Sequence, residues 1–121
     1  MSADTVLFVV WNRPAVGREA KGVALFQEFM AHLTEQQQRG NIESFEPVLL
    51  QVHGGDLNGF ILVRGTRQKL GELRASPVFS ALVVRCMLNV DGFGMVDGYT
   101  GTGVTTEMAL YSGAVNEQKN S

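Results

Sequence analysis

The segment Thr5–Trp11 constrains the fold more than any other part of the chain, because it is apolar on both faces. Side chains alternate along a strand with period two, so odd-numbered and even-numbered residues point to opposite sides. The two sets are Leu7, Val9 and Trp11, and Val6, Phe8 and Val10. A sheet with one face in water would alternate apolar with polar residues instead. We therefore expect a strand whose second face is buried against another subunit.

Residues 42–53 and 57–64 form two further strand-like segments with apolar side chains on both faces. Gly54, Gly55 and Asp56 connect them, and such a short glycine-rich link favours a hairpin. Pro47 lies within the first of the two segments, and proline cannot donate a hydrogen bond to a neighbouring strand. The sequence therefore predicts an antiparallel pair in which residues 42–53 form an edge or bulged strand.

Helical periodicity appears in two places. Across residues 18–39, apolar side chains recur at steps of three and four, and Gly40 then ends the pattern. Residues 66–74 are helical in character, and a second amphipathic helix restarts at Ser76 and Pro77 and ends near Asn89, because serine caps a helix and proline fits its first position. A last strand is expected over residues 90–99, followed by a short helix over 105–111 and a frayed polar tail.

This order of elements predicts an α+β fold, the ferredoxin-like βαββαβ plait, with a four-stranded antiparallel sheet. Both long helices then cover one face of the sheet and leave the other face open. The chain of 121 residues has the length of one domain over residues 1–121, with a core at about 4–100 and a C-terminal extension at about 101–121.

Composition excludes several classes of function. Apolar residues make up 45% of the chain and charged residues 18%, which is typical of a globular protein. The formal charge of −2 provides no positive surface for nucleic acid or an anionic membrane. Cys86 has no second cysteine to pair with, which favours a reducing, cytoplasmic location. The apolar run at residues 6–11 is too short for a signal peptide or a membrane span.

The order of elements, the two-sided strands and the ending Val-Asp-Gly-Phe-Gly-Met-Val-Asp-Gly-Tyr at residues 90–99 resemble the dimeric α+β barrel superfamily. That superfamily includes YCII-like proteins, stress-responsive barrel proteins and cofactor-free antibiotic-biosynthesis monooxygenases. The resemblance covers about residues 4–100. It implies a homodimer in which two sheets pair into a barrel, with a cavity for a small ligand in each subunit and no cofactor.

His53 is the candidate catalytic residue, since a histidine beside a carboxylate such as Asp56 can act as a general base. An ordinary polar hairpin explains the same residues. The YCII-like proteins are associated with a histidine and aspartate pair, but His53 and Asp56 do not align clearly with it. The candidate ligand-binding residues combine an apolar lining with a few polar groups: Trp11, Phe45, Leu49, Gln51, His53 and Tyr99.

Other motifs favour structural roles. Asp91 and Asp97 are about 20 Å apart along one extended strand, which excludes a catalytic carboxylate pair. The glycines of residues 92–103 do not fit a dinucleotide-binding pattern. Cys86 lies in an apolar helical stripe and should be an inert core thiol. His32 has no second ligand at metal-binding spacing, so no metal site is predicted.

Three hypotheses on function remain open. The first is a small homodimer that binds a hydrophobic small molecule in the barrel interior. The second is a cofactor-free enzyme of the same superfamily, an oxygenase or isomerase with His53 as base. The third is a purely structural dimer whose interior is filled by side chains; a fully packed interior would support it, whereas a cavity of a few hundred Å³ would support binding.

Overall fold

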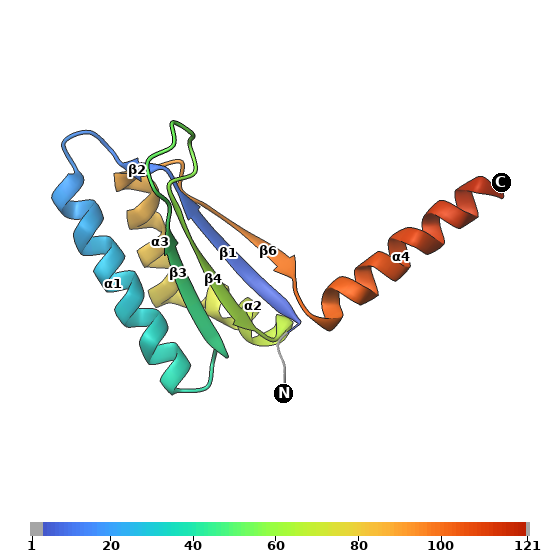
Figure 1. The fold of residues 1–121 in the computed structure, drawn as a ribbon. Helices are drawn as coiled ribbons and strands as arrows, with labels where there is room; N and C mark the ends of the chain where they lie inside the picture. The colour runs from blue at the N-terminus through green and yellow to red at the C-terminus, as the bar shows by residue number, and fades with distance from the viewer. Residues whose placement is uncertain (1–3, 121) are drawn as a thin grey trace.

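The computed structural model describes residues 4–120, and an antiparallel four-stranded sheet forms its centre (Figure 1). The strands lie in the order β3-β4-β1-β6, with bounds β1 (Thr5–Trp11), β3 (Ser44–Leu49), β4 (Gly59–Gly65) and β6 (Gly94–Tyr99). The long apolar β1 therefore occupies an interior position with β4 and β6 on either side. β3 is an edge strand, as the proline at position 47 predicts.

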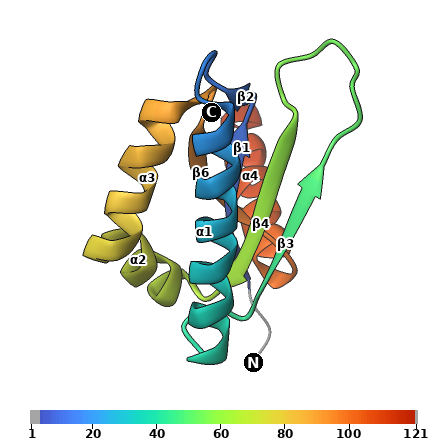
Figure 2. The ribbon, with the colours of Figure 1, turned by 90° about the vertical axis from the view of Figure 1, so that its left-hand side faces the viewer.

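Three helices cover one face of this sheet, as the βαββαβ order predicts (Figures 1 and 2). They are α1 (Glu19–Gln38), α2 (Arg67–Ala75) and α3 (Pro77–Asn89). Thr66 caps α2 by accepting a hydrogen bond from the backbone N–H of Lys69, and Ser76 caps α3 through the N–H of Phe79. The predicted helix restart at residues 76–77 is confirmed.

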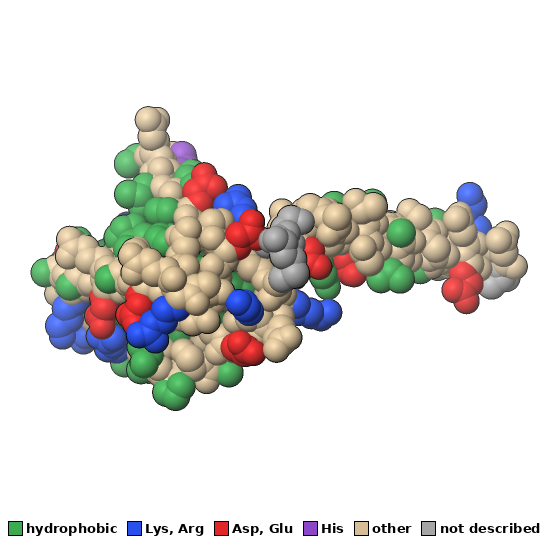
Figure 3. Space-filling model, turned by 90° about the horizontal axis from the view of Figure 1, so that it is seen from below, with side chains coloured by type: hydrophobic (Ala, Val, Ile, Leu, Met, Phe, Trp, Pro, Cys, Tyr) green, Lys and Arg blue, Asp and Glu red, His purple; other side chains and the backbone are tan. Residues whose placement is uncertain are grey.

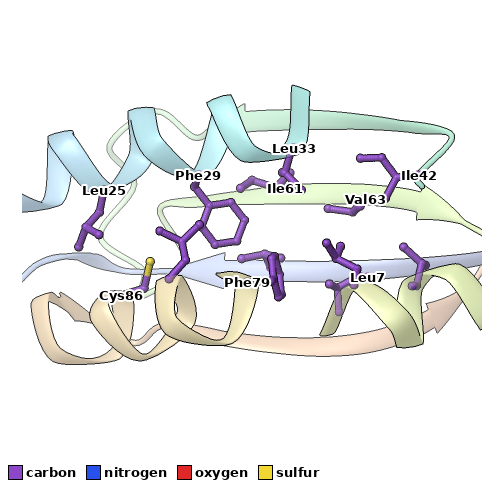
Figure 4. Packing of buried hydrophobic residues seen from close by; sticks show 13 residues of the cluster. Leu7, Leu25, Phe29, Leu33, Ile42, Ile61, Val63, Phe79 and Cys86 are labelled. Atoms are coloured by element: carbon purple, nitrogen blue, oxygen red, sulfur yellow. The ribbon is translucent and has the colours of Figure 1, made fainter. Parts of the chain in front are cut away.

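The core lies between the helices and the sheet (Figure 4). Leu7 and Val9 of β1 are fully buried on the helix side, and Phe29 of α1 meets Phe79 of α3 with ring centroids 5.5 Å apart. An ion pair on the outer surface, between Arg85 of α3 and Glu28 of α1, joins the same two helices. The hydrogen bonds from this guanidinium hold the pKa of Glu28 below its usual range.

Two predicted strands have the wrong bounds. β3 ends at Leu49, so residues 50–53 belong to a loop and not to the strand expected over 42–53. The strand expected over 90–99 is divided into β5 (Val90–Asp91) and β6, because Gly92 takes a positive φ of 67° between them. β5 pairs instead with β2 (Arg13–Pro14) in a separate two-stranded ladder.

The C-terminal helix is longer than the sequence predicts. α4 (Thr102–Lys119) has 18 residues, whereas a helix over 105–111 and a frayed tail were expected. It projects from the face of the sheet that α1, α2 and α3 leave open (Figures 1 and 2). Within the described part of the chain no helix has both the length and the apolar character needed to cross a membrane.

Candidate functional site

A cavity of about 400 Å³ lies between the helix layer and one end of the sheet. The strand β1, the first half of α1 and the end of α3 supply most of its walls, and Figure 4 shows Leu25 and Cys86 facing each other from the two helices. The lining comprises Val9, Trp11, Pro14, Gly22, Val23, Leu25, Phe26, Gln27, Phe29, Leu49, Ile61, Cys86, Val90 and Phe93. The cavity thus lies on the helix-covered side of the sheet.

Trp11 is held in the cavity wall by its cross-strand neighbour. Gly59 of β4 pairs directly with Trp11, and the indole lies in the space that a β-carbon on Gly59 would occupy. On the helix side, the ring of Phe26 packs edge-on against the indole, with centroids 5.8 Å apart. Such edge-to-face contacts orient aromatic rings, so Trp11 presents a defined apolar surface at this end of the sheet.

The cavity carries almost no charge. Among its described lining residues the one ionisable side chain is Cys86, which is 5% exposed. Burial raises the pKa of the Cys86 thiol from 9.0 to about 11, and the positive charge of the adjacent Arg85 opposes only part of this rise. The thiol is therefore neutral at physiological pH. Gln27 and the indole of Trp11 supply the polar groups of the lining. This chemistry suits a neutral, hydrophobic molecule.

Two of the six residues predicted from the sequence line this cavity. Trp11 and Leu49 lie on either side of Gly59 in the sheet register, and Leu49 is 69% exposed, which places it at the rim. Phe45 lies opposite Val63 on the same face of the sheet and packs against the core, but it does not line the cavity.

The other predicted residues lie elsewhere. Gln51 and His53 belong to the exposed loop between β3 and β4. Nδ1 of His53 accepts a hydrogen bond from the N–H of Gly55 at 3.1 Å, so Nε2 carries the proton and donates to the carbonyl oxygen of Leu57 at 2.7 Å. Tyr99 pairs with Thr5, at the opposite end of β1 from Trp11. The structure therefore does not bring these three side chains to the cavity.

Several lining residues were not singled out as site residues from the sequence. Phe26 and Phe29 belong to the apolar stripe of α1. Residues that fill a core and residues that line a cavity follow the same helical periodicity, so the sequence does not distinguish them. Gly22 carries a clearer signal, since a glycine inside a helix marks a close approach. A β-carbon there would lie 2.6 Å from Cγ of Pro14. Residues 4–120 contain no cluster of three or more side chains suited to binding a metal ion.

Comparison with known proteins yields matches in structure and none in sequence. No protein-family model and no curated protein matches the chain. A crystal structure of a dimeric protein of unknown function with a ferredoxin-like fold, from Bacteroides fragilis, aligns with a TM-score of 0.59 at 12% identity. The match covers 83% of this chain and all of that one. The protein has a ferredoxin-like fold.

A second solved structure is SnoaB, a cofactor-independent oxygenase from Streptomyces nogalater. It aligns with a TM-score of 0.50 at 18% identity and covers 82% of this chain and 93% of SnoaB. At this identity the similarity establishes the fold alone. The ferredoxin-like fold predicted from the order of elements is confirmed.

Proposed function

We propose that the protein is a homodimer that binds a neutral, hydrophobic small molecule in the cavity between α1, α3 and the sheet. The observation that carries the proposal is the cavity itself, with its volume of about 400 Å³ and its uncharged aromatic lining. Binding sites for small molecules are typically clefts of about 300–1,000 Å³ lined mainly by apolar side chains.

The dimer is supported by the open face of the sheet. Its side chains come from three neighbouring strands and are largely apolar: Val6, Phe8, Val10, Phe60, Leu62 and Val96. No helix of the described chain covers them, and Val96 is 58% exposed. The structural neighbour from Bacteroides fragilis is described as dimeric. A second copy placed on this face would remove its apolar surface from water.

Trp11 provides the test of ligand binding, since it is the one tryptophan of the chain and lies in the cavity wall. Titration with the neutral probe N-phenyl-1-naphthylamine should change the fluorescence of Trp11 and saturate at one probe per chain. The variant Cys86→Leu adds volume inside the cavity and should weaken this binding about tenfold or more. Val84→Leu is the matched control, because Val84 is 53% exposed on the same helix and lies outside the lining.

Two results would overturn binding in the cavity. If the probe did not bind to the folded wild type, the cavity would not be a ligand site. If the probe bound equally well to Cys86→Leu and wild type, the bound molecule would lie elsewhere. Circular dichroism of both variants separates loss of the site from loss of the fold.

A cofactor-free oxygenase is the second candidate, favoured by the fold shared with SnoaB and by a cavity with room for an organic substrate. The sequence suggests His53 as its base, although the structure places this side chain in the loop outside the lining. Oxygen consumption with a panel of phenolic substrates and no added cofactor tests the activity. If His53→Ala changed neither turnover nor affinity for a ligand, His53 would have no part in either function.

A further inference from the structure

Among the described residues, the helix α4 makes few contacts with the rest of its chain. None of its described side chains is buried, and it touches the rest of the molecule near its first turn, where Gly103 lies against the carbonyl oxygen of Asp4. Figure 3 shows the remainder of the helix standing clear of the body, with hydrophobic side chains along its length. The helix is therefore fully formed but unsupported over most of its 18 residues.

One side of α4 forms an apolar stripe. Val104, Met108, Tyr111 and Val115 follow one another at steps of four, three and four, which places them in a line along the helix. All four are exposed, from 38% for Val115 to 66% for Tyr111. This spacing is typical of a helix that packs against another surface along one narrow row of apolar side chains.

A helix of this length and composition needs such a contact. In proteins most of the stability of a helix comes from tertiary packing and not from intrinsic propensity, and Gly113 in the interior of α4 weakens the helix further. Its stability must therefore come from packing of the stripe against a surface outside the described contacts of the chain.

The total surface supports the same conclusion. The chain exposes 7862 Å². A compact monomer of 13.2 kDa would expose about 6,400 Å². The excess of about 1,400 Å² per chain would give a buried total of about 2,800 Å² in a pair, which is the range of stable homodimers. Exposed apolar side chains of the open sheet face, such as Val96, and of α4, such as Tyr111, contribute to this surface.

The charge of α4 and its position indicate which surface its apolar stripe packs against. α4 carries two glutamates, Glu107 and Glu117, and one basic residue, Lys119, whereas helices that bind anionic membranes are rich in lysine and arginine on their polar face. The helix also leaves the body on the open side of the sheet, where a second copy would lie (Figure 2). We propose that α4 of each chain packs through its apolar stripe on a second copy of the chain, so that the two copies exchange C-terminal helices. This inference rests on the proposed dimer.

The test compares two variants of the full chain by analytical ultracentrifugation. Met108→Glu with Tyr111→Glu places two charges in the stripe, whereas Thr106→Glu with Ala109→Glu places the same charges on the opposite side of α4. Since none of these side chains is buried in one chain, both variants should fold. We expect the stripe variant to raise the dimer dissociation constant about tenfold or more, and the control variant to change it less than about twofold.

The outcomes separate this inference from the dimer on which it rests. If the wild type is monomeric, both the proposed dimer and the helix exchange are wrong. If the wild type is a dimer and the stripe variant has the same dissociation constant, the helix exchange alone is wrong. Probe binding in the cavity is a third, independent readout, because the lining contains no residue of α4.

Discussion

At the scale of single residues, Cys86 links the cavity to the stability of the fold. Its pKa of about 11 in the folded protein, against 9.0 for an unperturbed thiol, means that the folded state holds the thiol proton more tightly. The protonated Cys86 thiol therefore contributes fully to the stability of the folded state below pH 9, and this contribution is lost as the pH rises through 11. We expect the difference in unfolding free energy between wild type and Cys86→Ala to shrink by about 1–2 kcal/mol between pH 8 and pH 11, after allowing for solvent screening at the cavity.

Urea unfolding of the two proteins in the presence of a reductant measures this difference. Lysine and tyrosine titrate in the same interval, but they are common to both proteins and cancel in the comparison. A difference that stays constant across the interval would show that Cys86 ionises as easily in the folded state as in the unfolded one. The burial of the thiol would then not control its ionisation.

At the scale of elements, Gly22 sets how closely α1 packs on β2. A β-carbon at this position would lie 2.6 Å from Cγ and 2.7 Å from Cβ of Pro14, so Gly22→Ala must push the helix and the strand apart. We expect the variant to lose about 1–3 kcal/mol of unfolding free energy in urea unfolding, which is typical of overpacking. Affinity for the hydrophobic probe should change as well, because both residues line the cavity.

Gly71 provides the matched control for this substitution. It also lies inside a helix, α2, but a β-carbon there would meet no atom within 4 Å. Gly71→Ala should therefore stabilise the protein by about 0.5–1 kcal/mol through the higher helix propensity of alanine. Equal effects of the two substitutions would mean that helix propensity, and not the contact with Pro14, determines the outcome at Gly22.

The bounds of the helices and strands show which parts of the fold could be predicted from the sequence. The periods of two and 3.6 that predict β1 and α1 are local properties, and both elements form within about one residue of their expected bounds. The end of β3 at Leu49 is a tertiary effect, since the strand continues only while β4 pairs with it, and β4 begins at Gly59. The full length of α4 was missed because the polar residues around its apolar stripe resemble a tail, and none of its described side chains is buried in one chain.

The candidate site could be predicted only in part, for the same reason. Trp11 and Leu49 were chosen as apolar side chains of two strands, and pairing of both strands with Gly59 brings them together. Gln51 and His53 have the same odd-numbered parity as Phe45 and Leu49, which would put them on one face of a strand, but β3 ends before both. Whether Phe26 fills a core or lines a cavity depends on the distance between helix and sheet. The periodicity of the sequence carries no information on this distance.

At the scale of the whole molecule, the open face of the sheet is the interface of the proposed dimer. Val96 of β6 lies opposite Phe8 of β1 on this face and is 58% exposed in a single chain. We expect Val96→Lys to raise the dimer dissociation constant about a hundredfold, because each copy would bury an unpaired charge between two apolar sheets. Sedimentation equilibrium measures this constant. The same substitution at Val84, on the outer surface of α3, adds an identical charge outside the proposed interface.

The pair of variants distinguishes a face-to-face dimer from other assemblies. A dimer that tolerated Val96→Lys but dissociated with Val84→Lys would be held together by the helix layer, and the apolar open face would need another partner. If only Val96→Lys dissociated it, the resulting monomer would expose the whole face, so it should also aggregate more readily than the wild type. Ligand binding in that monomer should persist, because the cavity lies on the other side of the sheet and every wall comes from one chain.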